Sequence, residues 1–213
     1  MIDADAFVTA DPRTIAAELD GAIHLWLLPW RREQGRAPLL GLLAAYLDVA
    51  PSALVLEENA HGKPCLKGAH ALRFNWSHSG DRAVVALAHD VDLGVDIEQA
   101  REGVHVLELA QRFFAPAEAN ALAACDEAER DRLFLRLWCA KEAVLKALGR
   151  GLAFGLERVE FALSTEGWRP VRFEAEAGAA ADWQIAALRL APDCPGALAW
   201  RGTPRPVFAW DGT

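Results

Sequence analysis

The stretch Leu93–Gly103, LGVDIEQAREG, contains the point at which the chain divides. Its first part, LGVDIE, is typical of a short strand, and the segments before it are apolar runs separated by turn residues. From Val104 the pattern changes to helix, beginning with VHVLELAQRFF. We therefore predict a division after Glu98, into an N-terminal half of residues 1–98 and a C-terminal half of residues 99–213.

Each half contains both helix and antiparallel strand. In the first half, a strand within Gly21–Trp30 and a buried helix over Leu39–Leu47 come before a meander of strands. In the second half helices come first, the longest over Glu127–Leu152 with glycine stops near its end, and strands return after Gly155. This order predicts an α+β fold of two halves, although no repeat is detectable residue by residue.

Charge and composition exclude several classes of protein. The 213 residues include 22 Lys+Arg and 30 Asp+Glu, a formal charge of -8, which disfavours nonspecific binding to nucleic acid or an anionic membrane. No uncharged apolar stretch reaches the roughly 18 residues that a membrane span needs, and the start MIDADAF lacks the pattern of a secretory signal. The four cysteines form no CxxC pair. We expect a cytoplasmic protein without nucleic-acid or membrane partners.

Asp96 and Glu98 stand two residues apart on the predicted strand, so both carboxylates project from the same face. Two neighbouring acids repel each other. They are tolerated if water solvates them at a strand end, or if a hard divalent cation such as Mg²⁺ binds between them. The pair alone leaves both interpretations open.

The helix around WCAKEAVLKALG adds a third acid. Glu142 and Lys146 are four residues apart and share a helical face with Trp138, whereas Lys141 points toward the apolar side. An exposed ion pair is the simpler interpretation. However, this is the chain's only Lys-Glu-Lys cluster in a protein that otherwise favours arginine. A carboxylate with a mobile lysine beside it suits a site for Mg²⁺ and phosphate.

Further polar groups come earlier in the chain. Ser77 and His78 are sequence neighbours and face opposite ways in extended backbone, so they cannot form a nucleophile and base pair with each other. They could instead bind an anionic ligand, or His78 could be structural. Lys63 lies on a predicted turn, and Arg36 comes just before the first long helix, where an anion site and a solvated surface are both plausible.

Five short motifs follow one another in an order that is similar to that of a known protein family. HGKP, FNWSHSG, LGVDIE, FFAPAE and WCAKEAVLKALGRGL follow one another between about Arg36 and Leu152. In this order they resemble the 4′-phosphopantetheinyl transferases of the surfactin-synthetase-activating type. The match covers more than half of the chain, and its most specific parts are the strand motif ending in Asp96 and Glu98 and the helix motif with Glu142 and Lys146.

This resemblance implies an activity and a fold. The activity is transfer of phosphopantetheine from coenzyme A, the substrate, to a serine of an apo acyl, peptidyl or aryl carrier protein. It uses Mg²⁺, or Mn²⁺ in its place, and releases adenosine 3′,5′-bisphosphate. The implied fold has two similar α/β halves related by a pseudo-twofold axis, with the active site in the cleft between them. A monomer is expected, and the natural carrier and pathway are not identified.

The resemblance also implies roles for individual residues. The stretch Val104–Glu118 would dock the carrier, although Phe113 and Phe114 could equally belong to the core. Glu142 would act as the base, directly or through water, together with Lys146 and Asp96 as catalytic residues. The metal ligands would be Asp96, Glu98 and Glu142, and the coenzyme A ligands Arg36, Lys63, Ser77, His78 and Lys146.

Two other functions remain to be weighed. A Mg²⁺-dependent nuclease would also use clustered acids and a lysine. The negative charge argues against it, and so does the spacing of Glu142 and Lys146 on a helix, since that group carries its Glu-x-Lys on a strand. A non-catalytic module that binds coenzyme A or a carrier protein would need only the shape, not the intact acids.

Overall fold

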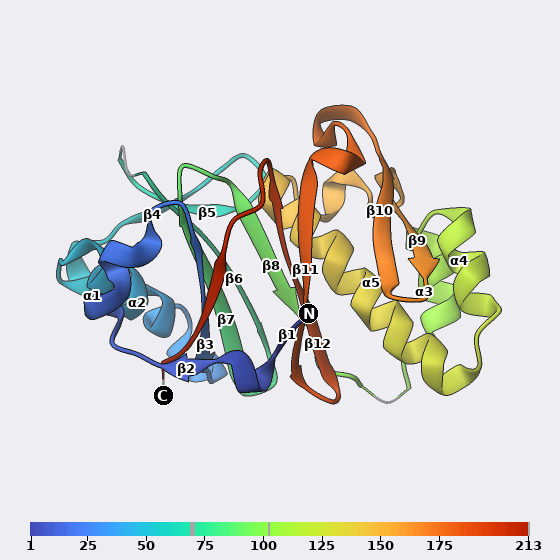
Figure 1. Ribbon diagram of the computed structural model, residues 1–213, viewed down its shortest axis with the longest axis horizontal. Helices are drawn as coiled ribbons and strands as arrows, with labels where there is room; N and C mark the ends of the chain where they lie inside the picture. The colour runs from blue at the N-terminus through green and yellow to red at the C-terminus, as the bar shows by residue number, and fades with distance from the viewer. Residues whose placement is uncertain (69–70, 102, 213) are drawn as a thin grey trace.

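Figure 1 shows the computed structural model, which describes residues 1–68, 71–101 and 103–212. The strands are β1 Ile2–Asp3, β2 Val8–Thr9, β3 Ile23–Pro29, β4 Leu56–Glu58, β5 Pro64–Leu66, β6 Leu72–Ser79, β7 Arg82–His89, β8 Leu93–Ile97, β9 Val159–Ser164, β10 Gly167–Phe173, β11 Trp183–Ala191, β12 Cys194–Arg201 and β13 Val207–Asp211. The α-helices are α1 Pro12–Ile15, α2 Ala37–Leu47, α3 Val106–Phe113, α4 Pro116–Ala123 and α5 Glu127–Leu148. The protein is therefore a mixed α/β fold.

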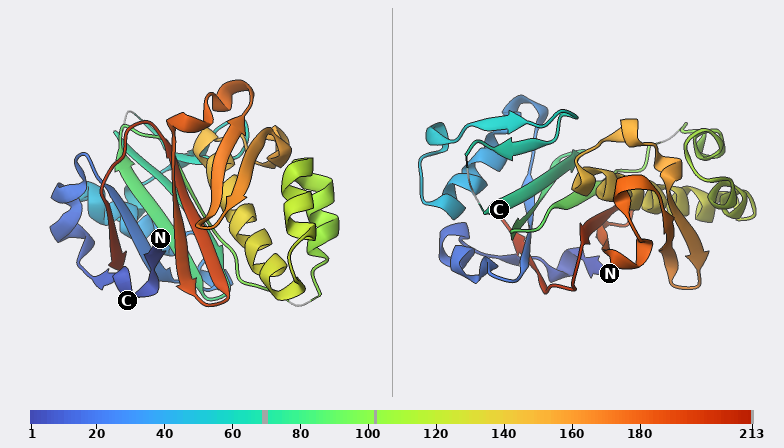
Figure 2. Two further views of the ribbon diagram at one scale, coloured as in Figure 1. Left: turned by 45° about the vertical axis from the view of Figure 1, so that its right-hand side comes forward. Right: turned by 90° about the horizontal axis from the view of Figure 1, so that it is seen from above.

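Two sheets and one long helix organise the molecule (Figure 1). A five-stranded sheet in the order β2-β13-β3-β7-β6 carries α2 on its outer face. A four-stranded sheet in the order β1-β11-β12-β8 lies beside it, and α5 packs on β8 and β12. The short sheet of β9 and β10 lies beyond α5 together with α3 and α4, as both views of Figure 2 also show.

The central strands are apolar because they are covered on both faces. Trp26 and Val85 pack toward α2, where Leu39 and Leu43 are fully buried. On the other face, alternate residues of β3 and β7 meet β8 and β12 of the second sheet in one apolar cluster. Strands buried on both faces have nearly continuous apolar sequences, and β7, RAVVALAH, is of this kind.

Helix α5 has clear signals at both ends. Asp126 precedes it, and its carboxylate accepts a hydrogen bond from the backbone N–H of Glu129 at 3.0 Å. Gly149 ends it in the left-handed conformation with φ 68°, which glycine adopts without strain. The helix therefore stops at Leu148, four residues before the end of the predicted range.

The two ends of the chain cross between the sheets. Strand β1 pairs in parallel with β11, and strand β13 pairs in parallel with β3 and β2. The first strand thus lies in the sheet built mainly from the last third of the chain, and the last strand lies in the sheet of the first half. The division after Glu98 stays a prediction. None of the helices in the described ranges is long and apolar enough to cross a bilayer.

His24 on β3 gives the fold a predictable response to acid. Its side chain is fully buried, its Nδ1 lies 2.6 Å from Tyr46 Oη, and burial lowers its pKa to about 4. In the unfolded chain this histidine binds a proton below its ordinary pKa of 6.5, so stability is lost as pH falls from 6.5 toward 4. We expect His24→Gln, measured by urea unfolding across this window, to lose less stability on acidification than the wild type. Parallel losses in both proteins would contradict the assignment.

Candidate active site

A cavity of about 690 Å³ opens between the five-stranded sheet and α5. Its walls come from distant parts of the chain, including the loop before α2, the end of β6, β8 and α5. It is lined by Trp30, Gly35, Arg36, Trp76, Ser77, His78, Asp96, Glu98, Trp138, Glu142, Lys146 and Leu152. The structure thus brings together all the site residues predicted from sequence except Lys63.

Gly94 allows β8 to lie directly against α5. A Cβ atom at this position would lie 2.9 Å from Lys146 Cβ and closer still to backbone atoms of Ala143 and Ala147. These neighbours are largely helix backbone and cannot move aside without shifting α5. The glycine therefore sets the close approach between the strand that carries Asp96 and the helix that carries Lys146.

We expect Gly94→Ala to destabilise the protein by at least the roughly 1–3 kcal/mol typical of an overpacked core, because the added methyl group meets backbone. Thermal and urea unfolding measure the loss. Gly41→Ala is the matched control: a Cβ there meets nothing within 4 Å, and α2 should gain about 0.5–1 kcal/mol from losing a helical glycine. If Gly94→Ala were as stable as the wild type, the close approach would not matter.

Lys146 and Asp96 form the centre of the site. Lys146 Nζ donates to Asp96 Oδ1 at 2.7 Å, to Ser77 Oγ at 3.0 Å and to the carbonyl of Val95 at 3.2 Å. Ser77 Oγ also donates to Asp96 Oδ1 at 2.9 Å. The second carboxylate oxygen, Asp96 Oδ2, is buried and has no hydrogen-bond partner in the structure. Lys146 and Ser77 therefore bond to the same oxygen of this buried carboxylate, and the hydrogen-bonding capacity of the other oxygen is unused.

Two further carboxylates share the cavity. Burial, reinforced by the charge of Asp96, raises the pKa of Glu142 to about 7. The same two causes raise the pKa of Glu98, whose Oε2 accepts a hydrogen bond from Ser79 Oγ at 3.3 Å. The raised pKa values of Glu98 and Glu142 show that nearby positive charge does not fully offset burial and the repulsion from Asp96.

These residues suit a divalent cation in kind. Mg²⁺ prefers carboxylate oxygens. The unpartnered oxygen of Asp96 shares the cavity with two acids whose pKa is raised, so a cation would be stabilised there. Across residues 1–68, 71–101 and 103–212, however, no three His, Cys, Asp or Glu side chains are already grouped closely enough to hold a metal. The carboxylates would have to draw together around it.

The other wall of the cavity is aromatic and basic. The His78 ring is exposed and stacks on Trp30, with centroids 3.8 Å apart and an interplanar angle of 12°. Burial, with a smaller contribution from Lys146, lowers the pKa of His78. Ser77 points the opposite way into the protein, as the alternation of the strand predicts. Arg36 precedes α2 and pairs with Glu58 at 2.9 Å on the surface.

Lys63 lies elsewhere. Its ammonium donates to the carbonyls of Leu93 at 3.2 Å and Ala147 at 3.1 Å, and nearby Asn59 Nδ2 donates to the carbonyl of Gly149 at 2.8 Å. Both side chains thus satisfy carbonyls at the C-terminal end of α5. The structure does not place Lys63 among the cavity residues, because its amine is already bonded to backbone.

The aromatic residues of the cavity were not among the site residues predicted from the sequence. Trp30 stacks on His78, and Trp76 lies 5.1 Å from the same ring. Trp138 lines both this cavity and a smaller one beside it. Trp76 and Trp138 stand inside the motifs FNWSHSG and WCAKE, and that proximity was the available signal.

The smaller cavity, of about 260 Å³, adjoins the first and shares Glu98 and Trp138 with it. Val104, Val106 and Leu109 contribute its apolar lining from the start of the predicted docking stretch. Within that stretch Phe114 is buried and stacks on Phe134, so it belongs to the core.

Comparison with known proteins places this geometry in a family. The family model described as the 4′-phosphopantetheinyl transferase superfamily matches residues 92–192. The 4′-phosphopantetheinyl transferase HetI of Nostoc sp. is 35% identical over 181 residues, which are 83% of this chain and 70% of HetI.

The matches to two other relatives cover a slightly smaller share of those proteins. The putative 4′-phosphopantetheinyl transferase slr0495 of Synechocystis sp. is 34% identical over 160 residues, 74% of this chain and 64% of that protein. The 4′-phosphopantetheinyl transferase Sfp of Bacillus subtilis is 31% identical over 144 residues, 65% of this chain and 63% of Sfp. The matches thus span roughly two thirds of these three relatives. With its acids and lysine gathered in one cavity, this chain belongs to the 4′-phosphopantetheinyl transferase superfamily.

Proposed function

We propose that the protein transfers 4′-phosphopantetheine from coenzyme A to a serine of an apo carrier protein. The observation that carries the proposal is the single cavity in which Asp96, Glu142 and Lys146 meet beside an aromatic and basic wall. The relatives named 4′-phosphopantetheinyl transferases support the same reaction. We further propose a monomeric cytoplasmic protein whose halves are 1–98 and 99–213, related by a pseudo-twofold axis.

The acids are the proposed cation site. Asp96, Glu98 and Glu142 would hold Mg²⁺, or Mn²⁺ in its place, and the unpartnered Asp96 Oδ2 supports this assignment. When bound, the ion supplies charge neutralisation for the pyrophosphate of coenzyme A. Since two of the acids have a raised pKa, cation binding and proton release should be coupled.

The protein's own groups perform the proton and phosphate steps. The carrier serine oxygen forms a bond to the β-phosphorus of coenzyme A, and the bond from that phosphorus to the bridging oxygen breaks, so adenosine 3′,5′-bisphosphate leaves. Glu142, directly or through a water molecule, accepts the serine proton. Lys146, already in the cavity with its side chain 26% exposed, exchanges its 3.2 Å hydrogen bond to the carbonyl of Val95 for a phosphate oxygen as negative charge develops.

The aromatic and basic wall is the proposed binding site for the nucleotide end of coenzyme A. The exposed His78 ring, stacked on Trp30, would donate to a phosphate, and Arg36 at the start of α2 would pair with another. We assign Ser77 to positioning Asp96 and Lys146, because its hydroxyl is bonded to both. We leave Lys63 out of this set, since its ammonium is bonded to backbone.

The adjoining apolar cavity is the proposed docking site for the carrier. It opens beside Glu98 and Trp138, so a serine presented there would be close to Glu142 on the same helix as Trp138. Its apolar residues, among them Val104 and Leu109, provide contact area for a carrier that does not depend on attraction between charges.

Intact mass of the carrier tests the proposed function. The purified protein is incubated with coenzyme A, Mg²⁺ and several apo carrier proteins, and the carriers are weighed with and without EDTA. A gain of one phosphopantetheine that EDTA abolishes is the expected result. Unmodified carriers with measurable coenzyme A binding would instead indicate a binding module, and cleavage of added nucleic acid would indicate a nuclease.

A further inference from the structure

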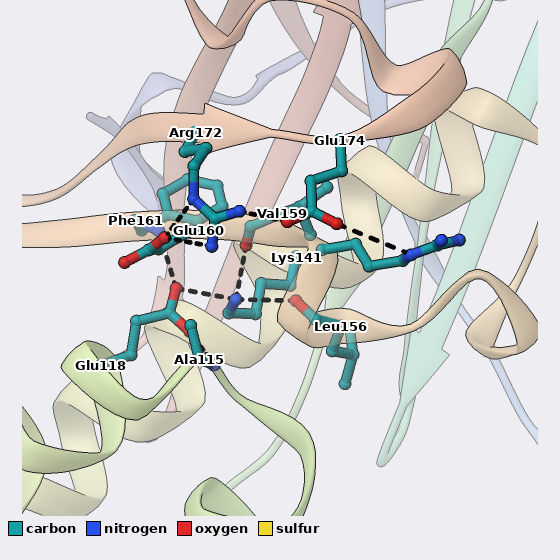
Figure 3. Close-up of polar contacts among 10 residues, drawn as sticks. Ala115, Glu118, Lys141, Leu156, Val159, Glu160, Phe161, Arg172 and Glu174 are labelled. Carbon is teal, nitrogen blue, oxygen red and sulfur yellow. Dashed lines mark hydrogen bonds and ion pairs between the residues drawn. The ribbon is translucent and has the colours of Figure 1, made fainter.

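A second pair of charges lies outside the cavity, on the far side of α5. Glu118 of α4 and Lys141 of α5 are both completely buried, and Lys141 Nζ lies 2.7 Å from Glu118 Oε1. Figure 3 shows the pair where α4, α5 and the start of β9 come together. The reaction proposed above uses neither residue.

The polar atoms of this pair are fully used. Lys141 Nζ donates to Glu118 and also to the carbonyls of Leu156 at 2.9 Å and Val159 at 2.5 Å, which accounts for all donors of an ammonium group (Figure 3). Glu118 in turn accepts from the backbone N–H groups of Phe161 at 2.7 Å and Ala115 at 2.8 Å. These bonds tie α4, α5 and the segment of residues 156–161 together at one point.

Burial reduces what this pair can contribute to the stability of the fold, because both charges are removed from water. It lowers the pKa of Lys141 to about 8 and raises the pKa of Glu118, so for both residues the environment opposes the charged form. Buried ion pairs can often be replaced by apolar residues without loss of stability, and some are retained because they specify one geometry. The pair therefore calls for a role other than stability.

The role follows from where Lys141 stands on its helix. Glu142 is the next residue, so the two side chains point about 100° apart around the helix axis. Trp138, Glu142 and Lys146, spaced by four, line the cavity, while Lys141 points into the core of α4 and β9. Gly94 lets α5 lie close to β8, and Lys141 bonds the opposite side of the helix to α4 and the start of β9.

We propose that Glu118 and Lys141 are a positioning pair that sets the rotation of α5 and thereby aims Glu142 and Lys146 into the cavity. This inference rests on the proposed function. The rings of Phe114 and Phe161 lie 5.1 Å and 5.7 Å from Lys141 Nζ and restrict the ammonium further. A small rotation of α5 would move the Glu142 carboxylate away from the reacting phosphate and lower the rate without altering the distant nucleotide wall.

The double variant Glu118→Gln/Lys141→Met tests the pair. It removes both charges and keeps an amide oxygen to accept one backbone N–H. Under conditions where it is folded by circular dichroism, we expect kcat to fall by about 10-fold to 100-fold and KM for coenzyme A to stay within about twofold. Mn²⁺ affinity, measured by paramagnetic resonance without coenzyme A or carrier, should weaken by about 10-fold, the range seen when a group that orients a ligand is lost.

Leu122→Ala is the matched control. Leu122 is fully buried on the same helix as Glu118 and its removal costs about 2–5 kcal/mol without touching the ion pair. The folded control should keep the wild-type kcat and Mn²⁺ affinity. An unchanged kcat in the double variant, or an equal loss in both proteins, would overturn the positioning role.

Two outcomes separate this inference from the proposed function. If the wild type transfers nothing to any carrier, the proposed function fails, while the Mn²⁺ comparison still reports whether the pair shapes the acid cluster. If the double variant does not fold, Glu118→Gln alone is read by the same criteria, because it removes the carboxylate charge that anchors Lys141 and keeps the lysine stem in the core.

Discussion

Glu142→Gln is expected to lower kcat for phosphopantetheine transfer by about 10²–10⁴-fold, the range for loss of a general base. Glu142 lies in the cavity with Asp96 and Lys146, and the amide can neither accept the serine proton nor contribute a charged ligand to the cation. Transfer is measured as carrier mass against time at saturating coenzyme A and Mg²⁺.

The same substitution should not weaken the fold. The pKa of Glu142 is raised from 4.5 to about 7, chiefly by burial, so in the metal-free protein the stability associated with this group falls as pH rises from 4.5 to 7. A neutral glutamine avoids that loss, and Tm measured in EDTA at about pH 8 should equal or exceed the wild-type value. Transfer at the wild-type rate would refute both roles of Glu142, and inactivity with a lower Tm would show that the residue is structural.

Lys146→Met is expected to affect both activity and stability. Its removal leaves the buried Asp96 without its only cationic partner at hydrogen-bond distance in the described part of the chain, and breaking such a pair costs about 3–5 kcal/mol. The transferring phosphate also loses a charged donor, which lowers kcat by about 10²–10³-fold. Urea unfolding and the carrier-mass assay measure the two effects.

A double variant and a surface lysine variant serve as controls for Lys146→Met. Asp96→Asn added to Lys146→Met should recover stability, because the unpaired charge of Asp96 is removed as well, without recovering activity. Lys67→Met removes an exposed lysine that pairs with Glu57 at 3.1 Å, and it should change stability by less than about 1 kcal/mol. If Lys146→Met were as harmless as Lys67→Met, Lys146 would not hold Asp96 in the folded protein.

Local patterns predicted the elements that build the site. The strands β7 and LGVDIE and the helix α5 all lie where the sequence predicted them, because their signals are short-range. Apolar residues mark the strands, helical spacing marks α5, and Gly149 marks the end of that helix. The same periodicities predicted that Asp96 and Glu98 share a face and that Ser77 and His78 do not. Motif order then suggested which of these residues would meet in space.

Contacts between distant segments were not predictable in the same way. Lys63 was expected near phosphate, but its ammonium reaches the end of α5, 84 residues later in the chain. Ser77 similarly reaches Asp96 and Lys146 on other elements. The pairing of β1 with β11 joins the two ends of the chain, and no local signal encodes it. Glu118 was visible only as part of FFAPAE, because its burial depends on α5 packing over it.

The central claim is that this cavity moves phosphopantetheine from coenzyme A to a carrier serine. The most direct measurement quantifies, in one reaction, the adenosine 3′,5′-bisphosphate released and the holo carrier formed. We expect equal amounts of both, formation of both slower by about 10²–10⁴-fold with Glu142→Gln, and neither product with a carrier whose acceptor serine is alanine. Nucleotide release without carrier modification, or modification at the wild-type rate with Glu142→Gln, would contradict this claim.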